Sequence, residues 1–345
     1  MRKKVTVRDV AKAGGVSIGT VSRVFNGLDN VDRELAEKVR RIAAELNYKP
    51  VTRAKLTESS SKEKDIYFAI MIADKFKVAE IWPQQVSFSI VRSLSQYGYK
   101  SVIEFHSEQS SEIPRIARKS SGCIVWGSFP EAFYANLARS ANNIPVVSYS
   151  REIPYSNSAS VIVGDKCAMR QATEYLLASK HRKIGLVTWS TEKGISNQRY
   201  QGFVETMEEF GQKVNPDWVM VKDKLEKEYE SDALVGYELT RRLLAKKEIP
   251  TAIIYSSDTL AKGGMEAIKK AGKLIPDDIS IIGFDDLVGS SETFPPLTTM
   301  KLDTLAIGRA ITETLEKFIT NRPVDKVVPL RRELIKRQTV AIRGN

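Results

Sequence analysis

The residues from Thr6 to Asn26 combine side chains that contact phosphates with side chains that read base edges. Ser17 and Thr20 carry hydroxyl groups suited to phosphate contacts. Arg23 has the reach and the planar donor fork for a guanine edge. In a helix, the outer face of this segment would carry Ser17, Ile18, Gly19, Ser22 and Arg23. Because a helix of this kind can enter the major groove, the pattern predicts a DNA-binding surface.

A second arrangement, far along the chain, suits a ligand rich in hydroxyl groups. Arg199 offers a planar fork of donors to vicinal hydroxyls. Asp285 follows an apolar strand, where an ionised carboxylate can accept two hydroxyl hydrogen bonds. The candidates for an aromatic platform under a sugar ring are Trp82, Trp126, Trp189 and Tyr229. Simpler roles stay open: an ion pair for Arg199, a turn cap for Asp285, and core or surface packing for each ring.

Enzyme chemistry has little support in the sequence. His106 and His181 have no Cys or Asp partner in motif spacing, and His181 lies in a polar turn before a strand. A G-x-S-x-G match at 15–19 lies between two short helices, whereas a nucleophile elbow needs a strand before the serine. Cys123 and Cys167 form neither a disulfide framework nor a metal pattern. We therefore expect no catalytic residues, no metal and no cofactor.

The positive charge of the chain is concentrated at one end. The 345 residues include 53 Lys and Arg and 42 Asp and Glu, a net charge of +11. Residues 1–64 hold 15 basic and 8 acidic residues, a net of +7, which leaves 38 against 34 and a net of +4 for residues 65–345. A small basic head on a nearly balanced body favours a polyanionic partner for the head. Since no signal peptide or membrane span is found, a reduced cytoplasmic setting is the simplest interpretation.

Three short helices are expected to position the residues of the head. Their predicted ranges are 6–13, 17–25 and 33–47. Thr6 and Asp32 are N-cap candidates, and the Gly14-Gly15 pair allows a tight turn with positive φ. The valines that can pack the first two helices together are Val10, Val16 and Val21. This is the arrangement of a helix-turn-helix, and it predicts a small all-α head.

From residue 65 onward, apolar strand runs alternate with helical stretches. The expected strands are 66–73, 102–105, 123–126, 146–149, 161–163, 184–189, 218–221, 252–255 and 279–284. The expected helices include 87–97, 168–178, 233–245 and 260–271. Such alternation predicts an α/β body of two lobes, with parallel sheets, helices on both faces and a ligand cleft at the carboxyl ends of the strands.

The head resembles that of the lac repressor–galactose repressor family, which reads T-x-x-D-V-A-x-x-A-G-V-S-x-x-T-V-S-R-V-x-N. Residues 6–26 match nearly every position, with Gly14 in place of the usual Ala. The similarity continues through Asp165 and the segments 199–203, 257–258, 282–286, 295–299 and 332–337. It implies a body like that of the periplasmic binding proteins.

The resemblance also implies roles at the DNA. It assigns Ile18 and Gly19 to operator preference and Arg23 to a shared base contact. The family's hinge folds on DNA and inserts a Leu into the minor groove, and Leu56 is the matching residue. The segment before this Leu is one residue shorter than in most members, as in the branch of the evolved β-galactosidase operon repressor. The remaining implied DNA contacts are Thr6, Asn26, Arg53 and Ala54.

In the body, the resemblance places an effector between the lobes. The implied effector residues are Trp82, Ser150, Arg199, Ser257 and Asp285. The expected organisation is a DNA-binding domain at 1–50, a hinge helix and linker at 51–64, and an effector-binding and dimerisation domain at 65–345.

The implied partners are double-stranded DNA with a pseudo-palindromic operator, a second copy of the chain, and a small sugar, with a galactoside as one candidate. Two alternatives stay open. One is a regulator of the same family that answers to a purine or to a phosphorylated partner protein. The other is a sugar-binding protein without gene control.

Overall fold

The computed structural model describes residues 5–25, 32–46, 48, 67–73, 81–107, 109–127, 129–140, 144–192, 194–222, 225 and 229–344. The undescribed side chains within its helices are those of Ser22, Arg23, Arg33, Ala138 and Ser140. The predicted hinge and linker at 51–64 lie outside the described residues, and so do the predicted DNA contacts Asn26, Arg53, Ala54 and Leu56. The chain divides into two compact units, Met1–Lys64 and Asp65–Asn345, and each is described by itself.

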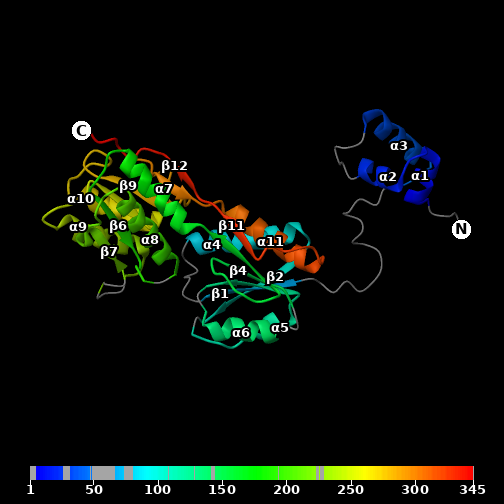
Figure 1. Cartoon of the computed structure of the whole chain (residues 1–345), viewed down its shortest axis with the longest axis horizontal. Helices are drawn as coiled ribbons and strands as arrows, with labels where there is room; N and C mark the ends of the chain where they lie inside the picture. Colours follow the sequence, from blue (N-terminus) through cyan, green and yellow to red (C-terminus); the bar gives the residue numbers. More distant parts are fainter. Residues whose placement is uncertain are drawn as a thin grey trace. The chain divides into compact units, whose positions relative to one another are not determined.

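The described part of the first unit is a bundle of three helices (Figure 1). They are α1 (Val7–Gly14), α2 (Ile18–Phe25) and α3 (Arg33–Glu45). Thr6 precedes α1, and its N–H and hydroxyl donate to the Asp9 carboxylate at 2.7 and 2.6 Å. The bundle closes over a small core whose buried members include Val10, Val21, Val24, Val39 and Ala43. The predicted helices agree with these to within two residues at their ends.

The two glycines at the end of α1 differ in conformation and give the first prediction. Gly14 is the last helical residue, and a Cβ there would meet Ile42 Cδ1 and Val16 Cγ2 at an ordinary 3.5 Å. Gly15 has a φ of 65°, which L side chains rarely adopt. Gly14→Ala should therefore stabilise the head by about 0.5–1 kcal/mol, whereas Gly15→Ala should cost about 1 kcal/mol. Hydrogen exchange of the α1 and α2 amides in the full chain measures both, and equal effects would contradict the assignment.

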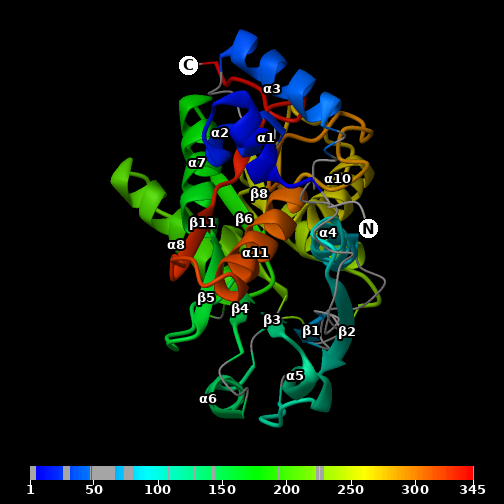
Figure 2. The same ribbon diagram turned by 90° about the vertical axis from the view of Figure 1, so that its right-hand side faces the viewer.

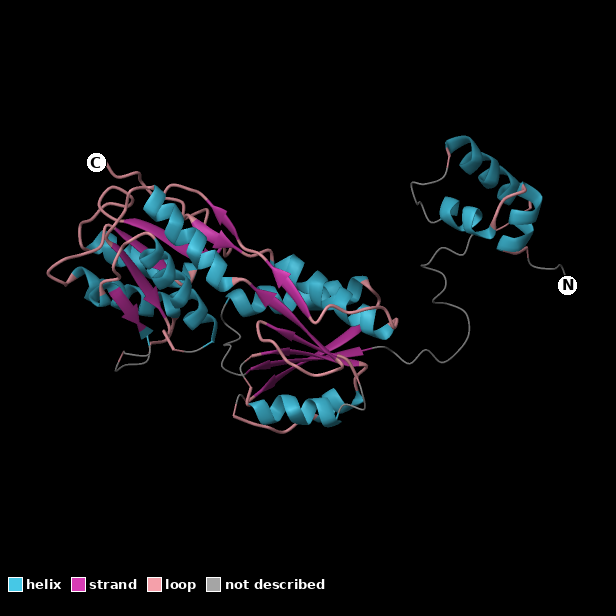
Figure 3. Cartoon of the chain, viewed as in Figure 1, coloured by secondary structure: helices cyan, strands magenta, loops and turns pink. Residues whose placement is uncertain are grey.

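The first lobe of the body is a parallel six-stranded sheet in the order β11-β5-β4-β3-β1-β2. Its strands are β1 (Tyr67–Ala73), β2 (Lys100–His106), β3 (Gly122–Trp126), β4 (Val146–Tyr149), β5 (Ser158–Val163) and β11 (Val327–Leu330). The helices are α4 (Ile81–Gln96) and α11 (Thr304–Ile319) on one face, and α5 (Arg115–Lys119) and α6 (Glu131–Ser140) on the other (Figure 3).

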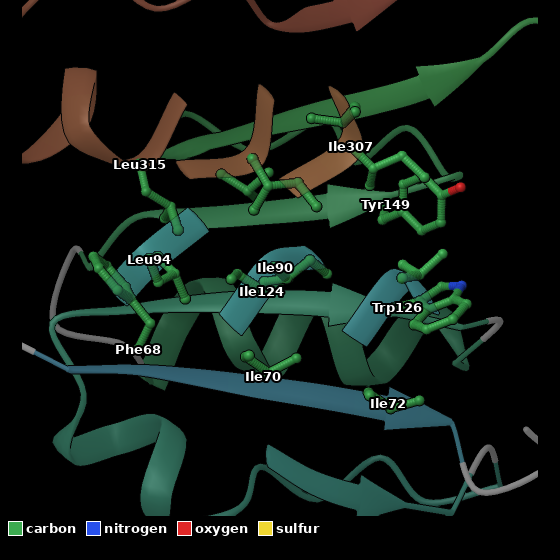
Figure 4. Packing of buried hydrophobic residues seen from close by; sticks show 14 of the residues in the cluster. Phe68, Ile70, Ile72, Ile90, Leu94, Ile124, Trp126, Tyr149, Ile307 and Leu315 are labelled. Atoms are coloured by element: carbon green, nitrogen blue, oxygen red, sulfur yellow. The ribbon is translucent and has the colours of Figure 1, made fainter. Parts of the chain in front are cut away.

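Alternation along β1 explains these two layers. Phe68, Ile70 and Ile72 pack under α4 and α11, where Ile90, Leu94, Ile307 and Leu315 meet them (Figure 4). Ala69, Met71 and Ala73 belong to the core on the opposite face, with the residues of α5 and α6. Both faces of the strand are buried, as expected for a parallel sheet covered on both sides.

The second lobe repeats the plan with the order β12-β10-β9-β8-β6-β7. Its strands are β6 (Ile184–Thr188), β7 (Val219–Val221), β8 (Ala252–Tyr255), β9 (Ser280–Asp285), β10 (Thr299–Lys301) and β12 (Glu333–Ile335). Helices α7 (Asp165–Ala178) and α8 (Gly194–Glu209) cover one face, and α9 (Asp232–Leu244) and α10 (Asp258–Lys270) the other (Figures 1 and 2). All neighbouring strands are parallel except β12, which runs antiparallel to β10.

The chain passes between the lobes three times among the described residues: between β5 and α7, between β10 and α11, and between β11 and β12. The last crossing consists of only Arg331 and Arg332. This architecture agrees with the predicted fold class of a small helical head and a two-lobed α/β body. None of the described helices is both long and apolar enough to cross a membrane.

Some predicted boundaries were wrong. Helix α4 begins at Ile81, six residues before the predicted start. The helix can include Pro83 because this residue lies in its first turn, where a proline is tolerated. Strands β2 and β5 are longer than predicted. The short strands β10, β11 and β12 were not predicted at all.

Candidate functional site

Among the described side chains at the start of α2, three of the predicted DNA-reading residues are exposed. Ile18 is 47% exposed, and Ser17 and Gly19 are also exposed, while the next residues inward are half-buried Thr20 and buried Val21. A Cβ on Gly19 would have only Ser17 Oγ near it, at 3.6 Å, so this position presents bare backbone. The backbone of Ser22 and Arg23 continues the same helix. An exposed isoleucine beside a bare glycine suits apolar contact with a thymine methyl group.

The hydroxyls at the start of α2 are partly engaged. Ser17 Oγ accepts the Thr20 N–H at 3.0 Å and lies 2.9 Å from Thr20 Oγ1. Ser17 is therefore the N-terminal cap, next to backbone N–H groups that suit a phosphate. Thr6 is exposed, but its hydroxyl is held by Asp9. These contacts fix the hydroxyls near the helix ends, where a DNA backbone would pass.

Four charged side chains of the body meet in one buried group, called here the charge cluster: Asp165, Arg199, Asp285 and Arg332. Asp165 is the first residue of α7, and Arg199 lies in α8. Asp285 ends β9 with a φ of 110°, and Arg332 lies in the crossing from β11 to β12. All four residues are buried, with exposed fractions between 2% and 7%.

Two arginines neutralise two carboxylates in the charge cluster. Arg199 Nε and Nη2 lie 2.8 and 2.7 Å from Asp165 Oδ1, and Nη2 lies 3.7 Å from Asp285 Oδ1. Arg332 Nη1 lies 3.0 Å from Asp285 Oδ1, and Arg332 Nε lies 3.3 Å from Asp165 Oδ1. Each carboxylate thus faces both guanidinium groups, and the four formal charges cancel. Such pairing is what makes buried charges tolerable.

Two atoms of the charge cluster, Asp285 Oδ1 and Arg332 Nε, lack an aligned hydrogen-bond partner among the described residues. Their ion-pair distances are short, but the geometry does not reach hydrogen-bond alignment. Burial raises the pKa of Asp285, and the neighbouring Arg332 and Arg199 oppose the shift. Buried polar atoms in proteins are normally hydrogen-bonded, so this acceptor and this donor are paired mainly by charge, with Arg332 at 3.0 Å and Asp165 at 3.3 Å.

Aromatic rings surround the charge cluster. The Cζ atoms of Arg199 and Arg332 lie 4.1 and 4.6 Å from the Phe284 ring centroid, and Arg332 Cζ lies 5.7 Å from that of Trp82. Tyr149 ends β4 beside Trp126, with ring centroids 5.6 Å apart (Figure 4). Burial raises the pKa of Tyr149, which also interacts electrostatically with Arg332, Asp165 and Asp285. The carboxyl ends of the two sheets therefore meet at this cluster.

Asp258 anchors the segment that follows Asp285. Its carboxylate accepts the Leu287 N–H and the Ser290 hydroxyl at 2.7 Å, and the Thr299 hydroxyl at 2.6 Å. These bonds tie the segment after β9 to the start of α10. Burial, followed by the charge of Asp285, raises the pKa of Asp258 to about 6. Sequence reasoning missed this residue, although an acidic side chain directly after a capping serine was a visible signal.

The predicted effector residues have different positions. Arg199 and Asp285 lie in the charge cluster, and Trp82 is half-buried beside Arg332. Ser150 follows β4 with a φ of 67° and is half-buried. Ser257 is buried, and its hydroxyl accepts the Leu260 N–H at 3.1 Å as the cap of α10. The structure thus brings Arg199 and Asp285 face to face and joins Trp82 to them through Arg332, whereas the described contacts of Ser150 and Ser257 do not reach these three residues.

The other three aromatic candidates are buried or half-buried. Trp126 is buried in the core of the first lobe. Trp189 and Tyr229 are partly buried beside the core between the second sheet and helices α9 and α10. The alternative of core packing therefore describes all three.

Arg332 is a second functional candidate that sequence reasoning missed. The local sequence carried no signal for it, because Arg332 stands next to the equally basic Arg331 and only the structure shows that Arg332 is buried while Arg331 and Glu333 are exposed. An arginine on the inward side of an edge segment needs an acidic partner, which Asp285 and Asp165 supply.

The histidines take no part in the charge cluster. His181 is buried, with Nδ1 2.9 Å from Thr251 Oγ1 and Nε2 3.1 Å from the Ala341 carbonyl oxygen. Burial lowers its pKa to about 4, so this ring is a neutral structural link. His106 Nε2 lies 3.0 Å from the Glu112 carbonyl oxygen.

Comparison with known proteins assigns a family to each part of the chain. Residues 6–51 match the family model of bacterial regulatory proteins of the lacI family. Residues 173–340 match the model of a periplasmic binding protein-like domain.

Individual relatives match nearly the whole chain. An HTH-type transcriptional repressor PurR of Haemophilus influenzae is 30% identical over 329 residues, covering 92% of each chain. A ribose operon repressor of the same species is 28% identical, again over 92% of each. The crystal structure of the lac repressor dimer bound to operator and the anti-inducer ONPF is 26% identical, with a TM-score of 0.67 over 98% of this chain and 100% of that chain.

Proposed function

The chain belongs to the lacI family of bacterial regulatory proteins, and we propose that a small uncharged sugar, bound at the charge cluster, controls its binding to an operator. As a member of that family it is a DNA-binding transcriptional repressor with a ligand-binding body, and not an enzyme.

The observation that carries the proposal is the pair of unaligned buried atoms, Asp285 Oδ1 and Arg332 Nε. One is an acceptor and the other a donor. A hydroxyl group donates one hydrogen bond and accepts others, so a single type of ligand group serves both atoms. The four charges of the cluster cancel, and the nearby Asp258 carboxylate has three hydrogen-bond donors of its own, so a neutral ligand leaves no buried charge without a partner.

A purine is the second candidate, because relatives at 30% identity are named PurR. A purine base would need a free aromatic face on which to stack. Phe284 lies within 5 Å of two guanidinium groups, at 4.1 and 4.6 Å, so its ring is already engaged. The half-buried ring of Trp82 lies beside Arg332 and could stack on either ligand, so the preference for the sugar rests on the donor and acceptor atoms of the charge cluster and not on the rings.

Calorimetric titration of the full chain separates the two candidates. The panel would hold neutral monosaccharides and disaccharides, including galactosides, together with hypoxanthine and guanine. We expect a neutral sugar to bind and to change operator affinity. Binding of a purine base alone would replace the sugar proposal with the purine one, and binding of neither would leave a phosphorylated protein partner as the effector to test.

The DNA-binding form is proposed to be a homodimer on a pseudo-palindromic operator, one head on each half-site. The edge strand β2 supports this, because its side chains Val102, Ile103 and Phe105 are exposed, and so is Phe88 on neighbouring α4. An exposed apolar edge of this kind is normally covered in a stable protein. Sedimentation of the full chain tests the dimer. A gel-shift assay tests the alternative of a sugar-binding protein without gene control, which predicts no shift of any DNA.

Arg23→Ala gives the second prediction. We expect specific operator affinity to fall by about 1–3 kcal/mol, as for the loss of a bidentate base contact. The operator would be found by selection from random DNA with the wild-type protein. Titration of this operator and of single-base variants then shows whether the preference at one position of each half-site disappears. Unchanged affinity and unchanged preference would rule out the base contact.

A further inference from the structure

Arg332 is buried, whereas the adjacent Arg331 is exposed. Arg332 lies in the two-residue crossing from β11 in the first lobe to β12 in the second. Arg331, the other residue of the crossing, is exposed, whereas the Arg332 side chain is 2% exposed. The guanidinium of Arg332 therefore lies in the charge cluster, and that of Arg331 lies outside it.

Arg332 is the principal counterion of Asp285. Arg199 is committed to Asp165 through two contacts, at 2.7 and 2.8 Å, and reaches Asp285 only at 3.7 Å. Arg332 Nη1 lies 3.0 Å from Asp285 Oδ1. Without Arg332, two carboxylates would face one guanidinium, and the buried site would carry one uncompensated negative charge.

We propose that Arg332 is a specificity-determining residue of the effector site, one that selects uncharged polyhydroxyl ligands and rejects cationic ones such as amino sugars. The proposal rests on the proposed function, since it deepens the choice of ligand at the same site. Its physical basis is charge balance: an ammonium group brought into the cluster has no free carboxylate to pair with, because Asp165 and Asp285 face two guanidinium groups and the nearby Asp258 carboxylate is held by three hydrogen bonds.

Removal of Arg332 should invert this preference. In Arg332→Met, Asp285 loses its closest cation, while the methionine keeps an unbranched apolar chain of similar reach. The ammonium group of an amino sugar can then take the place of the missing guanidinium. Loss of the guanidinium also lowers the affinity for the neutral sugar, because Arg332 Nε is one of the two atoms proposed to bind a sugar hydroxyl.

The test compares matched pairs of ligands that differ only in one group: galactose with galactosamine, glucose with glucosamine, and mannose with mannosamine. Calorimetry on the full chain gives the ratio of dissociation constants within each pair, and the ratio is insensitive to the fraction of protein that is folded. We expect Arg332→Met to shift the ratio toward the amino sugar by at least about tenfold. Arg332→Lys should restore the wild-type preference, and the control Arg331→Met should leave it unchanged. A sugar-binding Arg332→Met protein with the wild-type ratio overturns the proposal.

A second measurement needs no ligand. Thermal unfolding of the full chain should show a lower midpoint for Arg332→Met, and addition of Asp285→Asn to that variant should recover part of the loss. In the wild-type background, Asp285→Asn should instead lower the midpoint, because it leaves Arg332 without its closest carboxylate. If Asp285→Asn has the same effect in both backgrounds, Arg332 is not the counterion and the proposal fails. If the wild-type protein binds no sugar of the panel, the proposed function fails, and the proposed selectivity fails with it. The unfolding results would then still show whether Arg332 is the counterion of Asp285.

Discussion

Replacement of Arg199 by alanine is expected to lower effector affinity by at least about 100-fold and to destabilise the body by about 3–5 kcal/mol. Arg199 donates to Asp165 from Nε, faces Asp285 from Nη2 and donates to the Ser256 carbonyl from Nη1. Its loss leaves two buried carboxylates with Arg332 as their only guanidinium in the charge cluster. The operator affinity of the ligand-free protein should stay unchanged, because the head is a separate compact unit.

The measurements for Arg199→Ala are denaturant unfolding, calorimetry with the effector and operator titration with and without it. Arg199→Lys is the milder variant, because it keeps a cation at Asp165 and should retain more stability than alanine but not the planar fork. An Arg199→Ala protein that still responds to effector with normal affinity would disprove the assignment of this site.

Leu56→Ala is the reciprocal control. We propose that effector binding shifts the lobes and separates the hinge segments at 51–56, which meet as helices only on DNA. A segment this short has no stable helix of its own in water, so its formation depends on its partner and on DNA. Leu56→Ala should therefore weaken operator binding while effector affinity stays normal. Coupling of about 1–3 kcal/mol would change DNA affinity by roughly 5- to 150-fold.

The long buried elements of the body could be predicted from the sequence, because their own residues determine them. β4 and β8 have the predicted ends, Val146–Tyr149 and Ala252–Tyr255, since each is an apolar run buried on both faces. Strands β10 and β12 have three residues each and contain Lys301 and Glu333. Such short strands form because a neighbouring strand is already in place, and their own sequences carry no apolar run. β11 has exposed residues and Pro329, which a central strand would not tolerate.

The candidate site was half predictable for a related reason. Asp285 and Arg199 stand beside recognisable apolar segments, so their chemistry could be placed at the end of a strand and on a helix. Arg332 approaches them through a crossing that belongs to neither lobe. Ser257 has a role that its sequence position did not indicate: its hydroxyl accepts a backbone N–H as the cap of α10, and its predicted contact with the effector stays a prediction. Whether such a side chain belongs to the site depends on its burial and on the geometry of its partners, and the neighbouring sequence determines neither.

Operator affinity should fall by about 10³–10⁵ between 50 and 200 mM salt, if a dimer makes about six to ten phosphate contacts. The reason is counterion release: each phosphate neutralised by a Lys or Arg frees condensed cations, so log affinity falls linearly with log salt. Residues 1–64 supply the charge, with 15 basic against 8 acidic residues in each chain. Residues 65–345, at 38 against 34, are nearly balanced and should contribute little.

The salt slope also separates two kinds of contact in the head. Removal of one phosphate contact, for example through a charge-neutral substitution of an exposed basic residue such as Arg8, should reduce the slope by about 1 and weaken all DNA sequences alike. Arg23→Ala should instead change base preference, because a base contact releases few condensed ions. Filter binding or fluorescence titration at four or five salt concentrations measures the slope for operator and for unrelated DNA. A nearly flat plot for the wild-type protein would mean that the basic head does not bind the phosphate backbone, and the DNA-reading surface on α2 would then need another partner.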